Sequence, residues 1–129
     1  MKKKIYVCGN PMLDIDAMPF KILPELRALL PELEFLDFDP TENFPEDDPL
    51  YIVDTVINEG GVIVIRELGG LTDAPRFSAH DADLAFHLKW LEKMGKLPKL
   101  VIFGVPAAGE EKKIREDLVE TIKKSVAES

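Results

Sequence analysis

Three residues that lie far apart in the sequence could together bind a metal ion: Asp16, Asp54 and His80. Two carboxylates and one imidazole provide an oxygen, oxygen and nitrogen ligand set, which suits a first-row divalent metal. The three residues can act as one site only if the fold brings them to the same place. The metal hypothesis is therefore also a prediction about topology.

Two of these residues also have a structural explanation when each is considered alone. Asp16, like Asp14, is a candidate N-cap for a helix that begins near Ala17. His80 follows Ser78, which could cap a second helix, with Asp81 completing a capping box. The sequence alone leaves the choice between caps and ligands open.

Cys8 and His87 could in principle be catalytic, but their surroundings favour packing. Cys8 ends an apolar stretch, and a lone cysteine in that setting is typically a small buried hydrophobe. His87 lies at helical spacing from Leu84 and Leu91, which predicts a packed or partly buried ring. The sequence contains no GxSxG, HExxH or GxxxxGK[ST] motif, so the common hydrolase and nucleotide-binding sites are not indicated.

The elements that must position these residues follow from hydrophobic periodicity. Short apolar runs predict five strands, at 5–8, 34–38, 50–56, 62–68 and 99–105. Apolar residues at three- and four-residue spacing predict helices at 17–30, 78–94 and from 110 to the C-terminus. Pro24 is a potential kink in the first helix. The length of 129 residues fits a single domain over 1–129.

The alternation of strands and helices predicts an α/β fold, in which a five-stranded, mostly parallel sheet carries helices on both faces. Strand 62–68 follows strand 50–56 after the short Asn58–Gly61 segment, so we expect these two strands to pair antiparallel. In such sheets ligands bind beyond the carboxyl ends of the parallel strands. That rule points to residues 9–19, to Asp54 and to the loop before Ser78.

Composition and charge limit the classes of partner that the protein is expected to bind. The formal net charge of −8 argues against a nucleic-acid backbone and favours a basic partner or a cation. The apolar runs are too short to span a bilayer, the N-terminal stretch lacks a signal-peptide core, and one cysteine cannot form an internal disulfide. We therefore expect a soluble protein of the reducing cytoplasm. Its oligomeric state is not indicated.

Several segments resemble the hydrogenase maturation proteases, the endopeptidases of nickel hydrogenases. The N-terminal stretch from Ile5 through Gly9-Asn10-Pro11-Met12-Leu13-Asp14-Ile15-Asp16 resembles their Gly-Asn-x-Leu-Leu-x-Asp-[Glu/Asp] signature, with Asp16 on the last position, the metal-binding acid. Ile52–Val56 resembles the strand that carries the second ligand, here Asp54, and Ser78–Asp81 the stretch that supplies the third, here His80. Thr41–Phe44 further resembles the branch that serves formate-hydrogenlyase-type hydrogenases.

The resemblance implies a peptidase that removes the C-terminal extension of a nickel-loaded hydrogenase large-subunit precursor. Nickel would be supplied by the precursor, with no organic cofactor, and would be recognised through Asp16, Asp54 and His80. The bound metal would polarise the scissile carbonyl as a Lewis acid. Asp14 and Asp16 are the candidates for the general base.

The sequence also departs from the family pattern at its loops. Ile15, Ala17 and Pro19 replace an aspartate and two glycines, and the segment at 37–41 lacks an Asp-Gly-Gly-Thr loop. These departures leave open a non-catalytic nickel checkpoint or chaperone in hydrogenase assembly. A small-molecule-binding α/β domain, with the acids as caps, is a further alternative.

Overall fold

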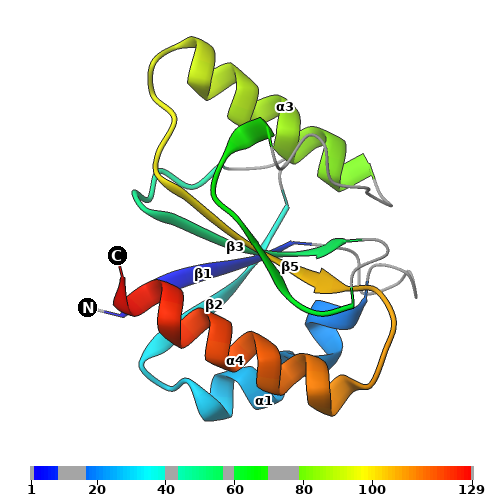
Figure 1. Cartoon of the computed structure of the whole chain (residues 1–129). Coiled ribbons are helices and arrows are strands. Elements are labelled where there is room, and N and C mark those ends of the chain that lie inside the picture. Colours follow the sequence, from blue (N-terminus) through cyan, green and yellow to red (C-terminus); the bar gives the residue numbers. More distant parts are fainter. Residues whose placement is uncertain (1, 9–16, 40–43, 57–59, 70–78, 129) are drawn as a thin grey trace.

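The computed structural model describes residues 2–8, 17–39, 44–56, 60–69 and 79–128, with the side chains of 79–83 left out. Figure 1 shows one twisted sheet between helices. The elements in chain order are β1 (Lys3–Cys8), α1 (Met18–Leu29), β2 (Leu33–Phe38), β3 (Leu50–Val56), β4 (Ile63–Ile65), α3 (Ala79–Lys93), β5 (Leu100–Pro106) and α4 (Glu111–Ala127). All the predicted strands and helices are confirmed to within a few residues, except that β4 is shorter than expected.

The sheet has the strand order β2-β1-β3-β5-β4. β1 pairs in parallel with both β2 and β3, and β3 pairs in parallel with β5. β4 runs antiparallel to β5 at one edge. The predicted α/β class, with a mostly parallel sheet and one antiparallel strand, is confirmed.

The predicted pairing of the fourth strand with the third is wrong, because β5 lies between β3 and β4. Residues 57–62 connect the two strands, and six residues can span about 20 Å. Next-nearest strands lie only about 10 Å apart, so the connection is long enough to cross one strand. The short connection therefore determines the direction of β4 relative to β3, but it does not determine which strand β4 pairs with. Part of the expected Asn58–Gly61 turn lies outside the described residues.

The two faces of the sheet are covered by different helices, as Figure 1 shows. α1 and α4 cover one face, where Ile5, Val53 and Phe103 from the sheet pack with Leu26 and Leu118 from the helices. This face forms the larger apolar cluster. α1 continues through Pro24, because the proline lies on the exposed side while Ile22, Leu23 and Leu26 hold the buried side.

α3 covers the opposite face, where its Leu84 and Leu88 pack against Ile52, Ile102 and other residues of the second cluster. The helix is followed by a tight turn. Gly95 adopts a positive φ of 71°, and the N–H of Lys96 donates to the carbonyl of Leu91 at 2.8 Å. Glycine suits this position because it has no Cβ to clash in the left-handed region. Within the described part of the chain, no helix is long and apolar enough to span a membrane.

Candidate functional site

The predicted site edge is the one at which the parallel strands end. β1, β3 and β5 run in the same direction, so their last residues, Cys8, Val56 and Pro106, lie toward one edge of the sheet. In open parallel sheets this edge receives ligands, since connecting loops rather than packed elements follow it. The described backbone places two of the predicted ligands, Asp54 and His80, near this end of the sheet.

Asp54 is the best-defined of the predicted ligands. It lies in β3, two residues before the end of the strand, and is fully buried. Side chains alternate along a strand, so Asp54 faces the same side as Leu50 and Ile52, toward α3. Its Oδ1 accepts a hydrogen bond of 2.8 Å from the backbone N–H of Thr55. This bond fixes the orientation of the carboxylate.

A fully buried carboxylate at this position needs a reason beyond packing. Transfer of a charged group out of water is costly unless hydrogen bonds, an opposite charge or a metal ion compensate it. The remainder of β3 is apolar apart from Thr55 and the hydroxyl of Tyr51, so an apolar side chain would satisfy the strand pattern equally well. The position of Asp54 therefore fits a ligand for a cation better than a surface cap.

Cys8 occupies the neighbouring place on β1. Val7 pairs with Val53, which makes Cys8 and Asp54 the next residues on the two strands. Cys8 is fully buried among the apolar residues of the α3 face. The predicted burial of Cys8 is confirmed.

Gly104 pairs with Asp54 on the other side, on β5. A Cβ added to Gly104 would lie 2.8 Å from Cγ1 of Ile63 and 3.0 Å from Cγ1 of Val56. Side chains of β3 and β4 thus close over the glycine, directly beside Asp54. Asp54 is fully buried, and a charged group in such a low-dielectric setting interacts more strongly with an opposite charge than it would in water.

His80 is brought toward the same edge by the direction of α3. The helix begins at Ala79, so His80 is in its first turn. Fifteen residues span about 22 Å, and the C-terminal end connects through residues 94–99 to the start of β5. α3 therefore begins on the side toward which the β5 arrow points in Figure 1. The side chain of His80 lies outside the described residues.

Asp16 also lies outside the described residues. The chain is described again from Ala17, and Ala17 is itself the N-cap of α1, without a side-chain cap. The N-cap position therefore falls on neither Asp14 nor Asp16, which removes the simplest structural explanation for these acids. Among the described side chains, no group of three His, Cys, Asp or Glu could hold a metal. The complete ligand set thus stays a prediction.

His87 belongs to a packed aromatic series away from this edge. Its ring stacks on Phe44 at 5.2 Å between centroids and meets the edge of Phe86 at 6.1 Å. The predicted packing of His87 is confirmed. What sequence reasoning missed is a set of exposed apolar side chains on the same helix, whose four-residue spacing was visible in the sequence.

Comparisons with known proteins agree on the fold. By sequence, no protein-family profile and no curated protein matches the chain. By structure, it is similar to the hydrogenase maturating endopeptidase HybD from Escherichia coli, with a TM-score of 0.59 and 21% identity over 98% of this chain and 90% of that one. It is also similar to the solution structure of an endopeptidase from Escherichia coli, with a TM-score of 0.61, 20% identity and the same coverage. At this identity the likeness establishes a shared fold.

Proposed function

We propose that this protein is a cytoplasmic endopeptidase that removes the C-terminal extension of a nickel-loaded hydrogenase large-subunit precursor. The observation that carries the proposal is the buried carboxylate of Asp54 near the carboxyl end of β3. It lies in the strand that resembles the second metal-binding segment of the hydrogenase maturation proteases. The fold similarity to a hydrogenase maturating endopeptidase over 98% of the chain supports the same conclusion.

In this proposal nickel is part of the substrate, because it is already inserted in the precursor. Asp16, Asp54 and His80 complete its coordination and so position the precursor. Two carboxylates and one imidazole leave coordination positions for the precursor's own ligands. The protein alone should therefore bind nickel weakly, and titration calorimetry with nickel chloride checks this. Tight binding without precursor would indicate a resident metal centre instead.

The reaction is hydrolysis of one peptide bond. Water adds to the carbonyl carbon, the C–N bond breaks, and the leaving amine takes a proton. A Lewis acid that polarises the carbonyl favours the addition. Asp54, held by the Thr55 N–H and fully buried, would contribute a fixed negative charge. Asp14 or Asp16 would accept the proton from water.

The departures from the family pattern define the competing checkpoint function. Ala17 and Pro19, which replace expected glycines, are both buried at the start of α1. A more rigid segment here could permit nickel recognition without the motion that cleavage needs. Such a protein would bind the nickel-loaded precursor but leave its mass unchanged.

The test compares purified precursor with and without nickel, using the mass of the large subunit as the readout. We expect the wild-type protein to shorten only the nickel-loaded form. His80→Ala and Asp16→Ala should abolish shortening while the melting temperature changes little, because Asp16 precedes the N-cap Ala17 and His80 lies within α3, so neither change removes an N-cap. Cys8→Ala should retain processing. A folded but inactive Cys8 variant, together with an active His80 variant, would replace this proposal with a cysteine-dependent hydrolase.

A further inference from the structure

α3 exposes a row of large apolar side chains on the side that faces away from the sheet. Phe86, Trp90 and Met94 are 67%, 54% and 45% exposed. They follow one another at four-residue spacing, the first two within the helix and Met94 in the turn after it, so they lie on one side. Leu84 and Leu88 of the same helix are fully buried against the sheet. α3 is therefore apolar on both sides, and only one side is covered by described residues.

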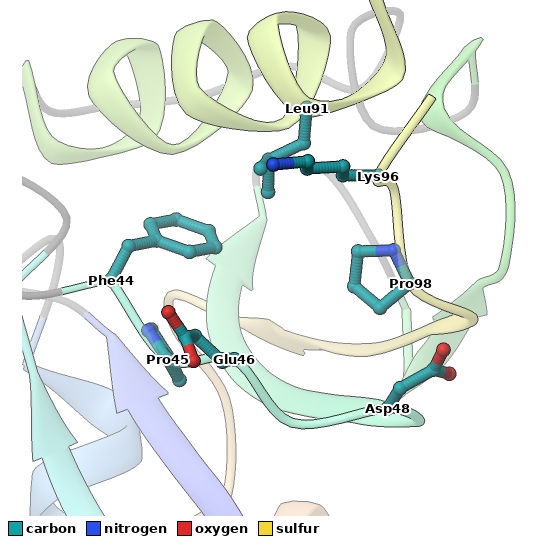
Figure 2. A pocket seen from close by; sticks show the side chains of 7 residues that line it. All are labelled: Phe44, Pro45, Glu46, Asp48, Leu91, Lys96 and Pro98. Carbon is teal, nitrogen blue, oxygen red and sulfur yellow. The ribbon is translucent and has the colours of Figure 1, made fainter. Parts of the chain in front are cut away.

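A cavity of about 360 Å³ lies between the end of α3, the segment before β3 and the segment before β5. Phe44, Leu91 and Pro98 give it apolar walls, and Figure 2 shows their side chains around the opening, with Lys96 beside Leu91. His87 joins the cavity to the exposed row, since its ring contacts both Phe44 and Phe86. We call the row Phe86, Trp90 and Met94 together with this cavity the α3 surface.

The charge near the α3 surface is opposite to that of the whole protein. Residues 84–96 contain Lys89, Lys93 and Lys96 against Glu92, a net charge of +2, whereas the chain carries −8. All four side chains are exposed. Glu46 and Asp48 line the far side of the cavity, so the basic character belongs to the helix side. A complementary partner would present an apolar surface with acidic residues at its rim.

The exposed area indicates what kind of interface this is. Three half-exposed side chains of this size offer on the order of 300–400 Å². A stable interface needs about 800 Å² from each partner, so a second copy of the chain held by this row alone would bind too weakly to persist. The row is better suited as the anchor of a larger interface, whose remaining area comes from another part of the same partner.

We infer that the α3 surface is the binding site for the nickel-loaded precursor. The precursor places an apolar side chain in the cavity, and it covers the exposed row with an apolar patch that has acidic residues at its rim. This inference rests on the proposed function. α3 then contributes to both ends of the interface. His80 is in its first turn, and the exposed row lies toward its C-terminal end. The precursor would contact the site edge and the α3 surface along a length of about 22 Å.

The experiment measures the affinity for nickel-loaded precursor by biolayer interferometry, and KM and kcat for its shortening. Trp90→Ser and Phe86→Ser should each raise Kd and KM at least about tenfold with kcat unchanged. Leu29→Ser is the matched control, since Leu29 is 50% exposed on α1, on the opposite face of the sheet. It should change neither constant more than about twofold. Lys89→Glu with Lys93→Glu should also weaken binding, whereas Lys113→Glu with Lys123→Glu on α4 should not.

The outcomes separate this inference from the function on which it rests. If the wild-type protein shortens the precursor but the Trp90 and Phe86 variants match Leu29→Ser, the docking inference is wrong and the endopeptidase proposal stands. If precursor binds through the α3 surface and is never shortened, docking stands and the endopeptidase proposal fails. A wild-type dimer in sedimentation that Trp90→Ser converts to monomer would assign the surface to a second copy and overturn the inference. Absence of any precursor binding overturns both.

Discussion

The two faces of the sheet differ in what they bury and what they expose. The face under α1 and α4 holds a large apolar cluster centred on residues such as Phe103 and Leu118. The face under α3 holds a smaller cluster, and along the same face the strand register places the buried carboxylate of Asp54. α3 also carries the exposed row Phe86, Trp90 and Met94. The face under α1 and α4 thus serves packing. The face under α3 combines packing with a buried carboxylate and exposed apolar side chains, which packing does not explain.

This difference shows how an α/β protein of modest size can separate its tasks. Two helices pack on one face and bury the larger apolar cluster there. On the other face, α3 keeps apolar side chains exposed, and its first turn lies near the carboxyl ends of the parallel strands. Stability and function should therefore respond to different substitutions.

The largest effect on stability is expected from the α1 and α4 face. Phe103 is fully buried there, and Phe103→Ala removes its contacts and leaves a cavity, which should lower the free energy of unfolding by about 3–5 kcal/mol. Phe86→Ala, on the exposed row, should change it by less than about 0.5 kcal/mol. Urea denaturation measures both. Equal losses would remove the contrast between the two regions.

A smaller effect is expected beside Asp54. Gly104→Ala places a methyl group against Ile63 and Val56, and overpacking of this kind costs about 1–3 kcal/mol. Gly60→Ala is the control, because no atom of the described residues lies within 4 Å of its added Cβ. Thermal melts of both variants test this. A Gly104 variant as stable as the Gly60 variant would mean that Ile63 and Val56 move aside easily and that the space over Gly104 is not closed.

The smallest effect concerns Tyr6, whose hydroxyl donates to Oδ1 of Asp47 at 2.9 Å. Burial, followed by this hydrogen bond, raises the pKa of Tyr6 to about 12 from 10.0. Because the folded state holds the proton more tightly, the stabilisation is fully present below pH 10 and is lost as the pH rises toward 12. Tyr6→Phe should lower stability at pH 8 by about 1 kcal/mol, and less at higher pH.

Urea denaturation of Tyr6→Phe and the wild-type protein between pH 8 and 11.5 measures this change. The difference between the two proteins should shrink as the pH increases. A difference that stays constant or grows would contradict the raised pKa. Tyr51→Phe serves as the control at pH 8, since its buried hydroxyl has no hydrogen-bond partner among the described residues.

Local sequence patterns predicted most of the fold, because hydrophobic periodicity reports directly on burial. Strand 50–56 was predicted to the residue, and the helix predicted from residue 110 is α4, in which Ile114, Leu118 and Ile122 are buried at four-residue spacing. The partner of β4 was not predictable in the same way. Pairing across β5 depends on a long-range fit, in which Gly104 makes room for Ile63, and no local pattern records such a fit.

The candidate site was predictable in part. The rule that ligands bind at the carboxyl ends of parallel strands placed Asp54 correctly near that edge, and its burial could not be inferred from its type, since aspartate is usually exposed. The exposed row on α3 was overlooked for the opposite reason. Phe86 and Trp90 share α3 with buried leucines, and Met94 follows in the turn after it, so the spacing alone does not show which of the two apolar sides the sheet covers.

The central claim is that Asp54 acts on the nickel of the precursor, and Asp54→Asn tests it most directly. The amide keeps the shape of the side chain and an oxygen that can accept the Thr55 N–H, but it loses the negative charge. The measurement is the rate at which the folded variant shortens nickel-loaded precursor. We predict a decrease of at least about 100-fold, with the melting temperature unchanged or higher. Processing at the wild-type rate would contradict the account.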